Sequence, residues 1–199
     1  MNLSRHHSFL LPLAALVLCA VMATPASAEQ RASSTAEAPV AQAAASCGNS
    51  DAVGGEVSER ALESSTVCLL NRERALRGLR GLRVNRRLSA AAQRHTDDMV
   101  RRRYFAHNSR SGASSVDRIR RTGYLKGARS WMVGENLARG SGSRSTPRSI
   151  VDSWMHSSGH RRNILTRRFR EIGIGVASRA PTSGSSAAAT YTTTFGQSG

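Results

Sequence analysis

Hydrophobic residues recur at helical spacing in two stretches near the middle of the chain. We expect the first helix to begin near Val57 with Ser58 as its N-cap and to end at Gly78–Gly81. Its apolar stripe comprises Leu62, Leu69, Leu70 and Leu76. We expect the second helix to begin at Ser89 and end at Phe105, with a stripe of Ala92, His95, Met99 and Arg103. Because His95 lies on that stripe, we interpret it as a hydrogen-bonded core histidine and not as a ligand.

Two further helices are predicted downstream. A short one covers residues 115–122 and stops at Gly123, a residue that suits the left-handed turn after a helix. The next begins at Thr146-Pro147, an N-cap followed by proline in the first helical position. Its apolar face comprises Ile150, Val151, Trp154 and Met155. His156 lies on the same helix, and we rank it below His160 as a functional residue.

Strands are predicted mainly in the C-terminal part of the chain. Residues 172–176 alternate apolar and small side chains, and residues 189–195 are rich in Thr and Tyr. Residues 181–186 form a turn-rich connection between them, and residues 131–138 form another strand. Because helices precede most of the strands instead of alternating with them, the sequence indicates an α+β fold with an antiparallel sheet.

The N-terminal part of the chain has the pattern of an export signal followed by a spacer. Residues 9–22 form an apolar run too short for a good membrane span, and Ala26-Ser27-Ala28 is a small-x-small cleavage site. We therefore expect residues 1–28 to be a signal peptide and the protein to be secreted. Residues 29–56, which begin with an Ala/Ser-rich stretch, are predicted to be a disordered spacer, and residues 57–199 the folded domain.

Three cysteines are present, and one of them lies in the predicted signal. Cys19 follows Leu18, whereas a bacterial lipoprotein site has a small residue before its cysteine, so we expect a released protein. In an exported protein, the remaining Cys47 and Cys68 predict one disulfide that ties the segment before the first helix onto that helix. Two free thiols are the alternative.

The formal net charge is +16, and Lys126 is the only lysine. Two interpretations stay open. A GC-rich genome favours arginine codons and accounts for the missing lysines, whereas attraction to anionic polymers, such as wall polymers or anionic lipid, would account for the net charge. The run Arg101-Arg102-Arg103 has no interleaved aromatic residues for base stacking, so we predict no specific recognition of nucleic acid.

Three separated phrases carry residues suited to chemistry: Tyr104-Phe105-Ala106-His107, Gly134-Glu135-Asn136 and Ser158-Gly159-His160. Imidazole binds metals or transfers protons near neutral pH, and a carboxylate can bind the same metal or orient a histidine. Two histidines and one glutamate are therefore the residue types of one polar cleft. No His-Glu-x-x-His phrase is present, so the spacing alone predicts no metal site.

An ordered set of phrases covers the chain from Cys68 to Gln197. They are Leu70-Asn71-Arg72-Glu73-Arg74, Tyr104-Phe105-Ala106-His107, Asp117-Arg118-Ile119, Gly123-Tyr124, Gly134-Glu135-Asn136, Trp154 to Leu165, Gly173-Ile174-Gly175 and Phe195-Gly196-Gln197. In this order the phrases resemble the CAP superfamily of cysteine-rich secretory proteins, antigen 5 and pathogenesis-related proteins, in its bacterial branch. The resemblance to this SCP-like extracellular domain implies an α-β-α sandwich with a central, mostly antiparallel sheet and a cleft.

In many members of that superfamily the cleft holds two histidines and two glutamates and can bind a divalent metal. The resemblance places His107, Glu135 and His160 in the cleft, as candidates for catalysis and for holding a metal such as zinc. The position of the second glutamate is Ser157, which we also expect to line the cleft, so the full tetrad is absent. Glu171 is the reserve candidate for the missing carboxylate.

Three hypotheses about function follow. The first is a secreted protein of the bacterial envelope whose cleft binds a lipid-like or cell-wall-derived ligand without turnover. The second is a hydrolase of peptide or cell-wall material, with a metal held by the three cleft residues or with Glu135 as general base. The third is a cationic protein that binds anionic polymers and whose cleft is vestigial. The sequence predicts no transmembrane segment and leaves the oligomeric state open.

Overall fold

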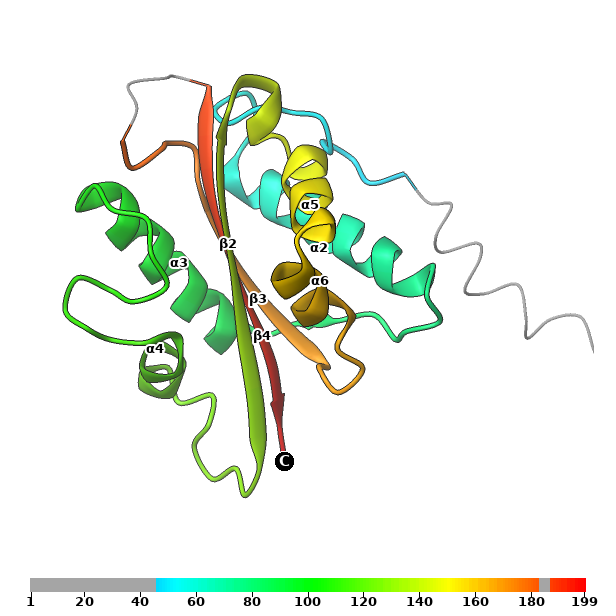
Figure 1. The fold of residues 1–199 in the computed structure, drawn as a ribbon, viewed down its shortest axis with the longest axis vertical. Coiled ribbons are helices and arrows are strands. Elements are labelled where there is room, and N and C mark those ends of the chain that lie inside the picture. The colour runs from blue at the N-terminus through cyan, green and yellow to red at the C-terminus, as the bar shows by residue number, and fades with distance from the viewer. Residues whose placement is uncertain (1–45, 183–186) are drawn as a thin grey trace, which may run out of the picture. The chain divides into compact units, whose positions relative to one another are not determined.

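A computed structural model describes residues 46–182 and 187–199. The predicted signal peptide, most of the predicted spacer and residues 183–186 lie outside the described residues. In the order of the chain, and with the labels of Figure 1, the elements are α2 (Glu59–Ala75), β1 (Arg83–Val84), α3 (Arg86–Arg101), α4 (Ser115–Arg121), β2 (Trp131–Ser141), η1 (Gly142–Ser145), α5 (Pro147–His156), α6 (Ser158–Leu165), β3 (Glu171–Ala177) and β4 (Ala188–Ser198). None of the helices within this described part is long and apolar enough to cross a membrane.

The four strands form one sheet in the order β1-β3-β4-β2. β1 pairs with β3 in parallel, and the other two pairings are antiparallel. Helices α3 and α4 lie on one side of the sheet, and α2, α5 and α6 lie on the other (Figure 1). The predicted α+β fold, an α-β-α sandwich with a mostly antiparallel central sheet, is therefore confirmed. β2 is an edge strand, and this position decides where the candidate site lies.

The two faces of β3 differ because large apolar residues alternate with glycines along the strand. Gly173 and Gly175 face α3, where an added Cβ would collide with the backbone of that helix. The helix can therefore lie directly against the strand, which a side chain at either position would prevent. The opposite face belongs to the main hydrophobic core and presents Ile172, Ile174 and Val176.

The first predicted helix is confirmed, but its stripe is one residue too long. Ser58 caps α2 by accepting a hydrogen bond from the backbone amide of Ala61 at 3.2 Å. The first three leucines of the stripe are buried. Leu76 was predicted to be buried with them and is 62% exposed, because the helix ends at Ala75 and the chain turns there.

The second predicted helix begins and ends earlier than expected. Asn85 caps α3 by accepting hydrogen bonds from the two amides that follow Arg86, so the helix starts before Ser89. At the other end Arg103 has a φ of +55°, a left-handed conformation that cannot continue a helix. The helix therefore stops at Arg101 instead of reaching Phe105.

The predicted helix after Thr146-Pro147 is two helices in the structure. Thr146 caps α5 and Pro147 is its first residue, as predicted. Ser157 then adopts an extended conformation (φ −98°, ψ 121°) and separates α5 from α6. His156 ends the first helix, and His160 belongs to the second.

The segment before α2 is attached to the domain at several points. The predicted disulfide joins Cys47 to Cys68 on α2, with 5.7 Å between their Cα atoms. Gly54 donates a backbone hydrogen bond to the Ser145 hydroxyl at 3.1 Å. Packed structure therefore begins N-terminal to the predicted boundary at residue 57, because the disulfide and these contacts order the segment.

Removal of the disulfide should lower the free energy of unfolding by about 3 kcal/mol, the chain-entropy value for a loop of this size. The Cys47→Ala/Cys68→Ala variant, compared with the oxidised protein by urea unfolding, measures the loss. A reducing agent should lower the stability of the native protein to a similar level and leave the variant unchanged. Equal stability of the oxidised protein and the variant would contradict the prediction.

Candidate functional site

A buried carboxylate on the edge strand is the centre of the site. Glu135 lies on β2, and its side chain is 3% exposed. The Arg118 guanidinium on α4 donates to Oε2 at 2.7 Å. The ring of His107, in the connection between α3 and α4, places Nδ1 3.0 Å from Oε1. Because an ionised carboxylate can only accept, His107 donates through Nδ1 and presents its Nε2 edge outward.

Arg118 also holds the connection that carries His107. Its guanidinium donates to the carbonyl oxygens of His107 and Ala113, both at 2.9 Å, and to the Ser109 hydroxyl at 3.2 Å. One buried cation therefore fixes both the loop and the carboxylate that the loop histidine meets. Arg118 belongs to the phrase Asp117-Arg118-Ile119, but its role is not readable from the sequence, because an arginine on a short helix carries no mark of burial.

Helices α5 and α6 meet β2 at its outer edge, where no further strand pairs. Asn163 on α6 donates to the Glu135 carbonyl at 3.1 Å and to the Asn136 side chain at 2.8 Å. The Trp154 indole on α5 donates to the Leu137 carbonyl at 3.0 Å. Asn163 and Trp154 therefore attach α6 and α5 to the free edge of β2.

The C-terminal end of α6 rests on a buried arginine. Arg74 on α2 donates to the carbonyl oxygens of Ile164, Thr166 and Phe169. Burial lowers the pKa of this guanidinium to about 10, with a smaller contribution from Arg170, so it stays charged at neutral pH. The position of His160, at the start of the same helix, therefore depends on α2 as well as on β2.

His160 completes the group of three predicted residues. The backbone carbonyl of His160 accepts a hydrogen bond from Asn136, the neighbour of Glu135, at 3.1 Å. Burial lowers the pKa of the His160 imidazole, and the nearby His107 lowers it further. The fold thus brings His107, Glu135 and His160 to one place on the edge of the sheet, with His160 neutral at neutral pH.

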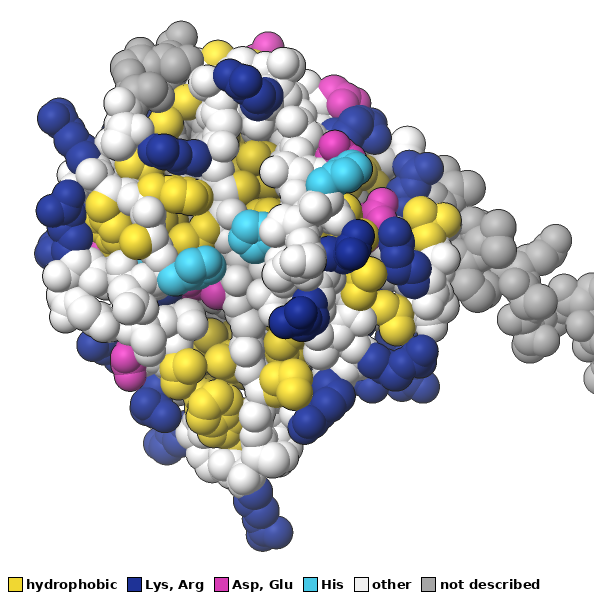
Figure 2. All heavy atoms as spheres, viewed as in Figure 1, with side chains coloured by type: hydrophobic (Ala, Val, Ile, Leu, Met, Phe, Trp, Pro, Cys, Tyr) yellow, Lys and Arg dark blue, Asp and Glu magenta, His cyan; other side chains and the backbone are white. Residues whose placement is uncertain are grey.

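A groove of about 260 Å³ opens beside His160. Its apolar walls come from Phe105, Leu137, Ala138, Ile150 and Trp154, and Ser149, Ser153, Arg139 and Arg144 supply polar groups. Figure 2 looks onto this face, with histidines and hydrophobic side chains near its centre and basic side chains mostly around the margin. The two arginines and the groove-lining serines carry no motif from which their place in the groove could be predicted.

The carboxylate and imidazoles do not fit a metal ion. Both oxygens of Glu135 already accept hydrogen bonds, one of them from a buried guanidinium cation that would repel a divalent ion. Ser157, in the position of the missing glutamate, supplies no carboxylate and does not line the groove. Across residues 46–182 and 187–199, no three His, Cys, Asp or Glu side chains are grouped to hold a metal.

The reserve carboxylate lies elsewhere. Glu171 accepts hydrogen bonds from Asn85 at 3.0 Å and from the Tyr124 hydroxyl at 2.7 Å. In this arrangement it does not supply the missing cleft carboxylate, because these partners occupy both of its oxygens and β4 separates its strand from β2. Its ion-pair partner among the described residues is Arg83, at 3.9 Å.

The other two histidines of the domain are not part of the group. His95 is 1% exposed and its Nε2 donates to the Ala106 carbonyl at 3.0 Å, which confirms a hydrogen-bonded core histidine. His156 is exposed on α5, and its Nδ1 lies 3.4 Å from Asp152 on the preceding turn.

Known proteins resemble this chain in sequence and in fold. Residues 67–194 match the model of the Cysteine-rich secretory protein family, CAP. The chain is 37% identical over 115 residues to YkwD of Bacillus subtilis, described as an uncharacterized protein; the match covers 58% of this chain and 42% of that protein. It is 29% identical over 114 residues to YlbC, an uncharacterized membrane protein of the same organism, covering 57% and 31%. The chain thus spans less than half the length of these relatives.

Two solved structures share the fold. One is an extracellular protein containing an SCP domain from Bacillus anthracis, with a TM-score of 0.53 and 24% identity over 71% of this chain and 44% of that one. The other is an outer surface protein of Borrelia burgdorferi, with a TM-score of 0.58 and 17% identity over 73% and 99%. At these identities the likeness shows the fold alone.

The Arg118→Met substitution should lower the free energy of unfolding by about 3–5 kcal/mol, because it leaves the buried Glu135 without its cation. In a double-mutant cycle with Glu135→Gln, the double variant should lose less stability than the sum of the losses in the two single variants. Urea unfolding measures each. Arg120→Met, an exposed neighbour on the same helix, serves as control and should change stability by less than about 0.5 kcal/mol. Additive losses would contradict the coupling.

Acidification should destabilise the domain through its buried histidines. Burial lowers the pKa of His95, with Arg118 adding to the effect and Glu135 and Asp98 opposing it, and burial also lowers the pKa of His160. As the pH falls, the unfolded chain therefore takes up protons before the folded protein does. The contribution of the two histidines to the free energy of unfolding is fully present above about pH 6.5, and it is lost as the pH drops toward their pKa values in the folded state. Urea unfolding midpoints at about pH 7.5 and about pH 5.5 measure this change of stability with pH.

The His95→Gln variant tests the contribution of one histidine to that slope. Glutamine keeps a donor for the Ala106 carbonyl and does not titrate, so the loss of stability on acidification should be smaller than in the native protein. The comparison uses the change with pH, and a general packing cost of the substitution does not affect it. The same slope in both proteins would show that His95 does not contribute.

Proposed function

We propose, because the chain belongs to the Cysteine-rich secretory protein (CAP) family, that it is a secreted protein whose cleft binds an anionic amphiphile. By this we mean a lipid-like molecule with an apolar chain and one acidic group. The observation that carries the proposal is the groove beside His160, whose walls are apolar and whose polar rim includes Arg139 and Arg144.

The walls of the groove suit a hydrocarbon chain. Leu137, Ile150 and Trp154 are nearly fully buried beneath it, and Phe105 is 37% exposed at its side. Each methylene group that such walls remove from water contributes about 0.8 kcal/mol to binding. A site that is largely apolar with a few placed polar groups is the usual form of a small-molecule pocket.

The arginines at the rim favour an acidic head group. The Arg139 guanidinium lies over the Phe105 ring, 5.0 Å from its centroid, and donates to Thr182 at 2.7 Å, so its position is fixed on both sides. Arg144 is exposed and has no ion-pair partner among the described residues. A carboxylate or phosphate between these two groups would gain charge-assisted hydrogen bonds.

The Arg118–Glu135–His107 group supports binding without turnover. Arg118 neutralises the glutamate, so the carboxylate does not repel an anion in the neighbouring groove. His160 and the two serines of α5 offer neutral hydrogen-bonding groups beside it. Secretion is proposed from the predicted signal, with support from the extracellular and outer-surface proteins that share the fold.

Hydrolysis is a second candidate for one reason. His107 is 57% exposed and is oriented by Glu135 at 3.0 Å, as a general base oriented by a carboxylate would be. Glu135 itself is not available to a substrate, because its two oxygens accept hydrogen bonds from His107 and Arg118. Incubation with an ester of dodecanoate distinguishes binding from hydrolysis, since only hydrolysis releases the free acid.

Calorimetric titration with dodecanoate, and with dodecanol as its uncharged counterpart, tests the proposed function. Ser153→Trp should fill the groove and weaken both ligands by about tenfold or more, since several buried methylene groups are lost. Arg144→Ala should weaken dodecanoate about fivefold to tenfold and leave dodecanol unchanged. Both positions are exposed, so the fold should tolerate the changes.

Ser64→Trp on α2 is the matched control, an exposed serine on a helix away from the groove. It should leave the affinity for both ligands unchanged. The proposal would be overturned by the absence of binding in the native protein, or by an equal effect of the two tryptophan substitutions.

A further inference from the structure

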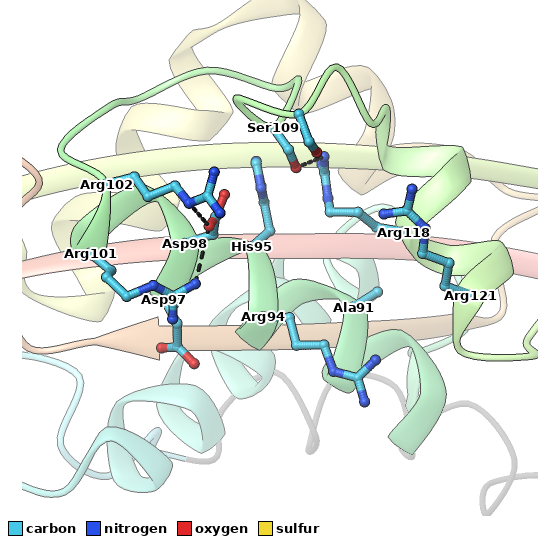
Figure 3. Close-up of a pocket in the computed structure, with 11 residues that line it drawn as sticks. Ala91, Arg94, His95, Asp97, Asp98, Arg101, Arg102, Ser109, Arg118 and Arg121 are labelled. Carbon is cyan, nitrogen blue, oxygen red and sulfur yellow. Dashed lines mark hydrogen bonds and ion pairs between the residues drawn. The ribbon is translucent and has the colours of Figure 1, made fainter.

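A second groove lies between α3 and the segment that leads into α4. Its volume is about 360 Å³. One wall is the face of α3 between Ala91 and Arg101, together with Arg102. The other wall is formed by Ser109, Ser111 and α4 (Figure 3). The apolar groove residues of the candidate cleft do not line it.

Positive charge dominates this second groove. Five arginines line it against two aspartates. Asp98 is occupied by Arg101 at 3.2 Å and by Arg102 at 3.0 Å, and it also accepts from the Tyr104 hydroxyl. The carboxylate of Asp97 points away from the loop that carries Ser109 and accepts from Gln93 at 2.9 Å (Figure 3).

Two of the arginines remain available. Arg94 on α3 and Arg121 at the end of α4 are exposed, and neither forms an ion pair within the described part of the chain. Arg118 is the exception among the five in being buried, and it is already paired with Glu135. The groove therefore has at least two guanidinium groups free to meet an anion.

The floor of the groove is polar. His95 rises from α3 toward Ser109, between the Arg102–Asp98 pair and Arg118 (Figure 3). It is 1% exposed, and its Nδ1 has no hydrogen-bond partner among the described residues. Ala91 is the only apolar residue among those that line the groove, so an apolar ligand would gain little there.

We propose that this groove binds a phosphate group, as a second site independent of the amphiphile cleft. Guanidinium groups present planar pairs of donors that match phosphate oxygens, and Arg94 and Arg121 supply them. The Ser111 hydroxyl adds a neutral donor at the rim. The phosphate is carried by a free oligophosphate or by a phosphodiester polymer, two sources with the same chemistry.

The test is calorimetric titration of the purified full chain at low salt with inorganic pyrophosphate and with a short glycerol phosphate oligomer. Arg94→Ala/Arg121→Ala should weaken the binding of the preferred probe at least about tenfold, since charge-assisted hydrogen bonds are lost. Arg60→Ala/Arg86→Ala is the matched control, with the same change in formal charge and two exposed arginines outside the groove. Thermal unfolding should show that both variants are folded.

The outcomes are distinct. Tighter binding of pyrophosphate assigns a free oligophosphate, and tighter binding of the oligomer assigns a polymer; both support the site. Equal weakening by the two double variants would show attraction to the overall charge and overturn it, as would the absence of binding by both probes. His160→Ala should leave phosphate binding unchanged, and Arg94→Ala/Arg121→Ala should leave dodecanoate binding unchanged, so this site and the proposed cleft can fail separately.

Discussion

The ion pair between Arg118 and Glu135 is the interaction on which the candidate site depends. A buried carboxylate is tolerated only when its charge is compensated and its oxygens accept hydrogen bonds. Here one guanidinium satisfies Oε2, and its remaining donors hold the backbone of the loop that carries His107. The loop, the helix and the edge strand are thereby joined at one point. Because this cation occupies the carboxylate, the site does not suit a divalent metal.

The edge position of β2 explains how helices on opposite sides of the sheet contribute to one site. An unpaired strand edge exposes backbone carbonyls that must be satisfied or covered. Trp154 and Asn163 supply side-chain donors to two of these carbonyls, and this brings α5 and α6 against the strand. The same edge is reached from the other side by His107. The break at Ser157 lets α6 turn toward the strand and place His160 beside it.

The arginines of the domain lie in several different environments. Arg74 and Arg118 are buried and hold the backbone of other segments. Arg139 and Arg144 line the apolar groove, whereas Arg94 and Arg121 line the polar groove between α3 and α4. Biased codon usage would account for arginine in place of lysine, but it would not account for the gathering of these cations at two grooves of different polarity.

Much of the fold could be predicted from the sequence because helix ends and strands are specified locally. Ser58 and Thr146 cap helices by hydrogen bonds to their own neighbours, and Pro147 suits the first helical position. The alternation in residues 172–176 gives β3 one apolar face and one face without side chains. Where a cap was missed, as at Asn85, or a left-handed residue ended the helix, as at Arg103, the boundaries were wrong.

The sequence by itself determined most of the helices and strands, through local caps and hydrophobic spacing. The family phrases predicted the layers of the fold and the meeting of His107, Glu135 and His160. Only the tertiary structure decided what those residues do to one another. Arg118, Asn163 and the groove arginines act across distant parts of the chain, and no local pattern distinguishes a buried arginine from an exposed one. The partner of Glu135 therefore became known only when β2 was placed against α4, because hydrogen bonding and burial depend on neighbours in space.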